Sequence, residues 1–274
     1  MGLIRRLGRG SGSAVLLLGV GLLGGCYTVP ETGRRSLVFV SASQEIQTGA
    51  AAFQQMKQEE TVSTNRVQID RVNSVGERIA EAVGDDLPGA EWEFVVFESP
   101  DLNAFALPGG KVGIYSGLLK VTETDAELAT VMGHEIAHVT ARHGSERMSQ
   151  NVLVAAGAIG IGVAMKDRSN ADRNAAMAAY GLGASIGVML PYSRRHETEA
   201  DTIGLRYAAR AGYDPRAAID FWERMARSSE DRNNPPEFLS THPADETRIR
   251  NLQNMMPAAV KIYETEGKDR QAGE

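Results

Sequence analysis

The sequence predicts an α+β fold that is mainly helical and contains a small sheet. Several segments carry apolar residues at the three- and four-residue spacing of a helix, whereas two short segments have the pattern of strands. Helices are expected at 42–59, 67–83, 201–211, 215–227 and 244–255, and strands at 92–96 and 111–116. With 274 residues, 42% of them hydrophobic, the chain can form one sizeable core, and we expect a single domain over residues 42–263.

The expected elements before residue 120 follow local patterns. The 67–83 helix has an apolar stripe, formed by Val72, Val75, Ile79 and Val83. In the first strand Trp92, Phe94 and Val96 alternate with their neighbours, which is typical of a half-buried strand. A turn signal, Leu107-Pro108-Gly109-Gly110, precedes the second strand.

The most informative motif is His134-Glu135-Ile136-Ala137-His138, which lies within the next expected helix. A helix turns about 100° per residue, so the two histidines project from one face and can hold one metal ion. Glu135 lies on the same side, where its carboxylate can reach a metal-bound water as a general base. The motif therefore predicts the metal helix of a zinc peptidase. The alternative is a core helix that carries these residues by chance.

Signals at both ends support this helix. Thr124-Asp125-Ala126-Glu127 has the form of a capping box, in which Glu127 reaches back to the N-cap amide, and Gly144 is expected to end the helix. The apolar residues between these ends suit a buried helix: Leu128, Val131, Met132, Ile136 and Val139. His143, five residues after His138, would then point away from the metal as a helix-end or core histidine.

Residues 1–25 have the pattern of a secretory signal, with arginines, then an apolar stretch, then small residues. Leu22-Leu23-Gly24-Gly25-Cys26 resembles a bacterial lipobox, so Cys26, the only cysteine, is expected to carry diacylglycerol. The alternative is an ordinary signal peptide followed by an unrelated cysteine. Tyr27 follows the cysteine, and resemblance to enterobacterial sorting rules then favours the periplasmic face of the outer membrane. Residues 26–41 are expected to be a lipid-anchored linker.

The charge of the chain excludes one class of partner. Removing the signal removes three arginines and leaves a formal charge of −9, with no basic stripe interleaved with aromatic residues. We therefore expect no nucleic-acid partner. The last residues, 264–274, are charged and have little to bury, so they are expected to be disordered.

Residues 151–190 are expected to form an apolar helical hairpin. Two segments rich in glycine and alanine, 151–165 and 175–190, flank a polar loop. Neither reaches the ~20 apolar residues of a confident membrane span. The hairpin lies in the chain between the metal helix and the next acidic motif, so we interpret it as a candidate lid whose glycines lower the cost of movement.

A catalytic zinc needs three protein ligands and one open position, so a third ligand must come from another segment. Glu197 and Asp201 are the best candidates, because they lie four residues apart on one face of a helix. One carboxylate could bind the metal while the other orients a ligand imidazole. The alternative is a solvated acidic face, beside which His196 would be a surface residue. A structural zinc site would require several cysteines.

Three ordered motifs make the chain resemble the gluzincin metallopeptidases of peptidase family M48, and its bacterial periplasmic lipoprotein proteases in particular. The motifs are His134-Glu135-Ile136-Ala137-His138, Ser193-Arg194-Arg195 leading into Glu197-Thr198-Glu199-Ala200-Asp201, and Thr241-His242-Pro243 with Arg248-Ile249 downstream. The resemblance implies a zincin-like fold with Glu197, rather than Glu199, as the third ligand, and Asp201 and Arg248 in support. It also implies that His242 lies near the zinc, where it could stabilise the oxyanion or occupy the open coordination position.

The family also has a strand that resembles Asn103-Ala104-Phe105-Ala106. An unpaired strand edge beside the metal would hold an extended peptide by backbone hydrogen bonds, which predicts broad sequence tolerance. Asn103, Ala104 and Phe105 are therefore expected to bind substrate. The alternative for Asn103 is a turn residue after Pro100-Asp101.

Together these patterns predict an endopeptidase with one Zn²⁺ per chain, held by His134, His138 and Glu197, with Glu135 as the general base. The resemblance and the expected lipid anchor indicate misfolded or unassembled envelope polypeptides as substrates, and envelope assembly machinery as a candidate partner. The alternative function is an envelope chaperone or assembly factor with a gated, rarely used metallopeptidase site. The intact Glu135 argues against that alternative.

Overall fold

The computed structural model describes residues 25–230 and 237–268, so the expected signal up to residue 24 and the end of the expected tail lie outside the described residues. The described chain is mainly helical with small sheets, as predicted. A mixed three-stranded sheet has the order β3-β5-β4. β3 (Glu93–Phe97) runs parallel to β5 (Lys111–Tyr115), and β4 (Ala104–Leu107) pairs antiparallel with β5 as an edge strand.

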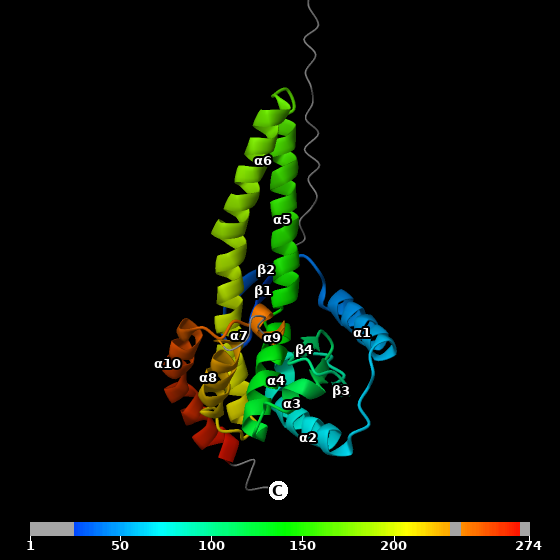
Figure 1. Ribbon diagram of the computed structural model, residues 1–274, viewed down its shortest axis with the longest axis vertical. Helices are drawn as coiled ribbons and strands as arrows, with labels where there is room; N and C mark the ends of the chain where they lie inside the picture. The colour runs from blue at the N-terminus through cyan, green and yellow to red at the C-terminus, as the bar shows by residue number, and fades with distance from the viewer. Residues whose placement is uncertain (1–24, 231–236, 269–274) are drawn as a thin grey trace, which may run out of the picture.

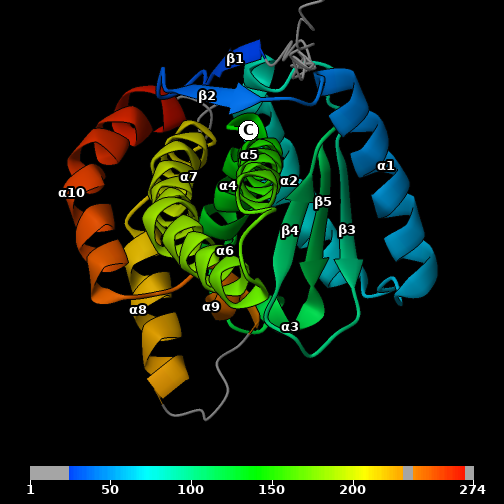
Figure 2. The ribbon, with the colours of Figure 1, turned by 90° about the horizontal axis from the view of Figure 1, so that it is seen from above.

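Helices cover both faces of this sheet (Figure 2). On one face α1 (Ala42–Glu59) places Phe53 in a small aromatic cluster with Phe97, Phe105 and Tyr115. On the other face Val96, Val112 and Ile114 join the main core, which also holds residues of α2 (Arg66–Val83) and α4 (Asp125–Thr140). The sheet therefore lies between α1 and the helix that carries the zinc motif.

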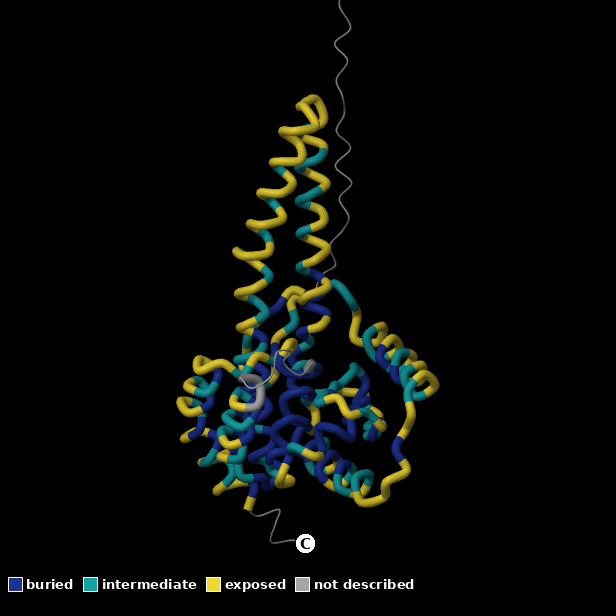
Figure 3. The backbone as a smooth tube through the Cα atoms, in the orientation of Figure 1, coloured by how far each residue is buried: buried dark blue, intermediate teal, exposed yellow. Residues whose placement is uncertain are grey.

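The remaining helices of the body pack on the opposite side of α4 (Figure 1). They are α7 (Leu190–Arg210), α8 (Ala217–Glu230), α9 (Glu237–Thr241) and α10 (Glu246–Ile262). The body also contains three short helical segments: η1 (Gly84–Asp86), α3 (Ser116–Leu119) and η3 (Tyr263–Gly267). Buried residues concentrate around α4 and the adjoining part of α7 (Figure 3). Because η3 reaches Gly267, the expected disorder of residues 264–274 is wrong for residues 264–267.

Two glycines bring α4 and α7 unusually close together. A Cβ added to Gly133 would lie 2.8 Å from the backbone oxygen of Gly204, and one added to Gly204 would lie 2.7 Å from the backbone nitrogen of His134. Any larger residue would push the two backbones apart. Because Gly133 precedes the first motif histidine, this contact sets how near α7 comes to the metal helix.

The N-terminal part of the body differs from the expected linker at 26–41. The strands β1 (Gly25–Thr28) and β2 (Arg35–Val38) form a two-stranded antiparallel sheet instead of an extended linker. This small sheet contacts α5 and buries Val29 and Ser36. Its short, mostly exposed strands lack the alternation that would mark them in a sequence.

The ends of α4 also differ in part from the prediction. Thr124 accepts a hydrogen bond from the Glu127 amide as expected, but the Glu127 carboxylate accepts from the amide of Glu123 rather than from the N-cap. The helix ends at Thr140, so Gly144 is not its stop signal. Arg142 adopts a left-handed conformation with φ of 56°, and a new helix, α5, begins at His143.

The expected hairpin is longer than predicted and rises away from the body (Figure 1). α5 (His143–Ala164) and α6 (Asn170–Ala184) form its two legs. A π-helical segment (Ser185–Met189) then joins α6 to α7 without a break. Among the described residues, one helix, Asn170–Arg210, is long and apolar enough to cross a membrane by length and composition.

Candidate metal centre

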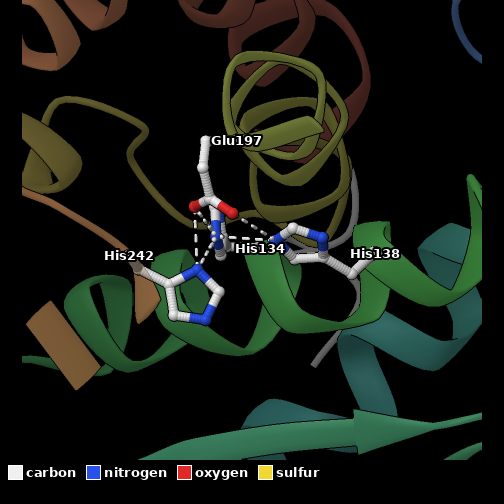
Figure 4. Close-up of side chains that lie close together, drawn as sticks. All are labelled: His134, His138, Glu197 and His242. Atoms are coloured by element: carbon white, nitrogen blue, oxygen red, sulfur yellow. Dashed lines mark hydrogen bonds and ion pairs between the residues drawn. The ribbon is translucent and has the colours of Figure 1, made fainter. Parts of the chain in front are cut away.

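Four side chains with metal-binding atoms meet in the interior of the body (Figure 4). His134 and His138 come from α4, Glu197 comes from α7, and His242 follows α9. One ligand atom of each lies within 4.8 Å of the others. Elements far apart in the sequence therefore bring together the two motif histidines, the expected third ligand and the expected catalytic histidine.

The spacing of these atoms fits a tetrahedral zinc ion. Zinc bonds of about 2.0–2.1 Å place neighbouring tetrahedral ligands roughly 3.3 Å apart. The Nε2 atoms of His134 and His138 are 3.1 Å apart, and they lie 3.3 Å and 3.4 Å from the Glu197 carboxylate oxygens. His242 Nδ1 lies 3.1 Å from His134 Nε2, so this structure places it at the fourth position. Three imidazoles and one carboxylate are ligand types that zinc prefers.

Charges at the cluster favour an ionised carboxylate. Burial raises the pKa of Glu197, but hydrogen bonds from His134 and His242 lower it far below the usual range. Burial and the Arg248 charge lower the pKa of His134, yet hydrogen bonds to Asp201 and Glu197 raise it to about 9. Without a metal, the cluster therefore holds a proton that a bound cation replaces.

Asp201 orients the first motif histidine. Its Oδ1 lies 2.9 Å from His134 Nδ1, which leaves Nε2 of the same ring facing the cluster. Arg248 donates two hydrogen bonds to the Asp201 carboxylate, at 2.9 Å and 2.7 Å, and its guanidinium stacks on Trp222. Both residues therefore lie where they can fix the tautomer of a metal ligand.

His143 performs the corresponding task for His138. It is a buried histidine at a helix end and lies outside the metal cluster, as expected, but its ring faces His138 instead of pointing away. Its Nδ1 lies 2.9 Å from His138 Nδ1, and its Nε2 lies 3.0 Å from the Glu199 carboxylate. A carboxylate can only accept, so His143 Nε2–H donates to it and His143 Nδ1 accepts from His138 Nδ1–H. The lone pair of His138 Nε2 is then free for a metal. Only the expected direction of the ring was wrong, because α4 ends at Thr140 and His143 belongs to a new helix.

A row of buried charges extends from Glu199 to the N-terminal sheet. Thr32 and Arg34 both donate to Glu199, and Arg34 also donates two hydrogen bonds to Glu146. His196 donates to Glu146 and is 1% exposed, so the expectation that it lies on the surface is wrong. No local pattern marks this row in the sequence, because its members are buried by mutual pairing across distant segments.

Glu135 lies beside the cluster with an unused acceptor. Its Oε1 is buried and has no hydrogen-bond partner, although His242 Nε2 is 3.5 Å away. Burial raises the pKa of this carboxyl group above its usual range. A carboxylate with a free oxygen and a raised pKa suits proton transfer to and from a reacting group.

The cluster opens into a cleft of about 560 Å³, within the size range of ligand sites. The cleft is lined by β4, by the start of α1, by α4 and by the first turns of α5. Only the root of the hairpin takes part, so in this structure the hairpin does not cover the cleft as a lid would.

β4 presents its free edge at this cleft. The Tyr115 amide donates to the Asn103 carbonyl, and bonded pairs alternate along an antiparallel ladder, so the backbone groups of Ala104 and Ala106 face away from β5. The Ala104 amide is occupied by the Asn103 side chain at 2.9 Å. The Phe105 ring packs against Gly113 and the aromatic cluster under α1. Phe105 pairs with Gly113 in the ladder, so its backbone groups face β5; it lines the cleft but offers a substrate neither a free backbone group nor its ring.

Comparison with known proteins agrees with this geometry. The family model described as peptidase family M48 matches residues 66–256. The mitochondrial metalloendopeptidase OMA1 of Saccharomyces cerevisiae is 33% identical over 267 residues, which cover 89% of this chain and 75% of that protein. The OMA1 metalloendopeptidase of Arabidopsis thaliana is 39% identical over 186 residues, 67% of this chain and 36% of that protein.

A bacterial relative has the same degree of similarity. The beta-barrel assembly-enhancing protease of Escherichia coli is 31% identical over 249 residues, which cover 86% of this chain and 50% of that protein. The chain therefore spans about half the length of this relative. From the extent of these matches, the chain belongs to peptidase family M48, a family of zinc-dependent metallopeptidases.

Proposed function

We propose that this metalloprotease is an endopeptidase of the bacterial cell envelope that cleaves extended segments of misfolded or unassembled proteins. The observation that carries the proposal is the free edge of β4 beside the metal cluster. An edge strand recognises backbone rather than sequence, so it accepts any chain that is locally extended. Folded proteins rarely offer such a segment, whereas unfolded ones do.

Substrate would bind as an added strand on β4. The Ala106 amide and carbonyl and the Ala104 carbonyl supply the backbone partners, because they face away from β5. This pairing would place a substrate peptide bond in the cleft between β4 and the cluster, where Glu135, His138 and His242 also line the wall. Only small pockets beside the β4 edge would then select side chains, so the protease would accept a broad range of substrate sequences.

Zinc held by His134, His138 and Glu197 would polarise the scissile carbonyl and lower the pKa of a coordinated water. Glu135 accepts a proton at its unpaired Oε1 and returns it to the leaving amine. His242 must turn its Nδ1 away from Glu197, now 2.8 Å distant, before substrate can use the fourth position. Its ring could then donate to the developing oxyanion.

The envelope location rests on the N-terminal motif and on one relative. Cys26 is exposed, as an acylated residue must be, and it follows a lipobox-like segment. The relative from Escherichia coli is named as a protease that enhances β-barrel assembly. These features support substrates among unassembled envelope proteins, cleaved by a protease that a lipid tethers at the periplasmic face of the outer membrane.

Substrate trapping in cells tests this proposal. A Glu135→Gln variant, expressed in its native host, should retain unfolded envelope proteins that the wild type degrades, and the proteins captured should share no sequence motif. A Glu135→Gln, Ala106→Pro double variant is the matched control, because it also lacks one backbone donor of the edge. Capture of only folded or cytoplasmic proteins, or equal capture by both variants, would refute it.

A further inference from the structure

The α5/α6 hairpin carries most of the exposed apolar surface of the described chain. Ten of the thirteen large hydrophobic residues that are exposed lie on the hairpin or on residues 185–190, which continue its second leg: Met148, Val152, Leu153, Ile159, Val163, Met177, Leu182, Ile186, Val188 and Leu190. No residue from 150 to 195 is buried. Exposed residues predominate along this stretch of both legs, and the others are only half-buried (Figure 3). A single folded partner would cover one side of such a hairpin, whereas a hydrocarbon environment covers every side.

The uncharged stretches of the hairpin have the length of a bilayer core. Residues 148–165 and 174–193 contain no Asp, Glu, Lys or Arg. At about 1.5 Å per residue these stretches are roughly 27 Å and 30 Å long, close to the ~30 Å of a bilayer core. Charges return at the tip, in Lys166, Asp167, Arg168, Asp172 and Arg173, and at the root, in Arg147, Arg194 and Arg195.

The backbone of the hairpin is also internally satisfied, as the backbone of a structure in lipid must be. Both legs are helical, so their backbone groups bond within each leg. The legs touch where the Tyr180 hydroxyl donates to the Val154 carbonyl at 2.8 Å, over Gly157, which has no side chain in the way. The one phenol between the legs thereby has a partner.

We propose that this hairpin spans a lipid bilayer, with the charged tip in the far headgroup region. The root of the hairpin lies beside Cys26, since Cys26, Leu153, Tyr192 and Arg195 line one surface hollow. The expected lipid and the apolar legs would therefore enter the membrane at the same level. Because Met148 and Arg147 also line the catalytic cleft, insertion places the cleft against the membrane surface.

Fluorophore quenching in vesicles tests the depth of the hairpin. Since Cys26 is the only cysteine, Cys26→Ser removes the acylation site and leaves a background for single labels. In that background a fluorophore is attached at Ile159→Cys, Leu182→Cys, Ser169→Cys or Val67→Cys. The vesicles contain phosphatidylethanolamine and phosphatidylglycerol with brominated acyl chains. Labels at 159 and 182 should be quenched, whereas labels at the tip and at exposed Val67 on α2 should not.

Vesicle flotation of charged variants gives an independent result. In the Cys26→Ser protein, Ile159→Lys and Leu182→Lys should each weaken flotation by about a hundredfold. Val67→Lys, which alters an equally exposed apolar residue on the body, should float like the parent. Cleavage of a short soluble peptide by each variant verifies the fold.

Three outcomes would overturn the proposal. Unquenched labels at 159 and 182 would exclude insertion, and a tip label quenched as strongly as these would exclude spanning. A dimer in solution that Ile159→Lys dissociates would instead show that a second copy covers the hairpin. None of these outcomes depends on the proposed substrates, so the hairpin and the protease function can fail separately.

Discussion

Replacing His143 with leucine tests whether a buried hydrogen-bond relay prepares the metal site. His143 is fully buried and supplies no ligand atom to the cluster, but its ring links His138 to Glu199 at 2.9 Å and 3.0 Å. Leucine fills a similar volume without a polar atom, so His138 would lose its acceptor and could turn or change tautomer. The change should therefore weaken zinc binding while the fold persists.

The size of the effect follows from what the relay does. Groups that orient a metal ligand typically contribute 10- to 100-fold in metal affinity, which corresponds to about 1.4–2.7 kcal/mol. Burial lowers the pKa of His143 to about 4, so the ring is neutral at pH 7 and carries a single proton. That proton lies on Nε2, because Glu199 can only accept.

Competition with a chromophoric chelator measures the zinc affinity directly. His143→Gln is the matched control, because its amide offers one acceptor for His138 and one donor for Glu199. We expect His143→Leu to lose 10- to 100-fold in affinity and His143→Gln to retain most of it. Equal affinities of the wild type and the leucine variant, or equal losses in both variants, would refute the relay and leave His143 as a packing residue.

Three further predictions address other parts of the site. His242→Ala should leave zinc bound and raise basal peptide cleavage if Nδ1 holds the fourth position at rest, whereas a fall of about 10²-fold or more would identify an oxyanion stabiliser. Ala106→Pro should raise KM with little loss of thermal stability, because an edge strand tolerates proline where its amide faces outwards. The control Ala106→Ser keeps the amide and should leave KM unchanged. Burial would raise the pKa of Glu146, but hydrogen bonds from His196 and Arg34 lower it to about 2. Its folded pKa lies below the unfolded value of about 4.3, so its stabilisation, at most about 3 kcal/mol, is complete above that value and is lost as pH falls towards 2. The free energy of unfolding, measured with denaturant, should therefore fall less between pH 7 and pH 3 for Glu146→Gln than for the wild type. Equal falls in the two proteins would contradict the pairing.

Local patterns predicted the elements that local chemistry determines. The expected 42–59 helix matches α1, and the expected strands at 92–96 and 111–116 match β3 and β5 to within a residue. The two histidines of the metal motif needed only the period of one helix to converge. Glu197 needed the resemblance to a family, because no spacing within one helix relates α4 to α7.

Other parts of the site depend on long-range packing that a sequence does not display. Arg142 has no feature that marks a left-handed residue, yet its conformation turns the chain so that His143 approaches His138. The Arg34 side chain is buried only in the folded protein, where it forms ion pairs with Glu146 and Glu199 from distant segments. The contact of Gly133 with Gly204 is likewise invisible until two helices are placed side by side.

Metal content and casein cleavage of a Glu135→Gln variant test the central claim most directly. Glu135 transfers protons and is not a metal ligand, whereas His134, His138 and Glu197 bind the metal. The variant should therefore bind one zinc ion per chain and lose cleavage by about 10²- to 10⁴-fold, whereas His138→Ala should lose the metal together with the activity. Full cleavage by a zinc-loaded Glu135→Gln protein would contradict the account.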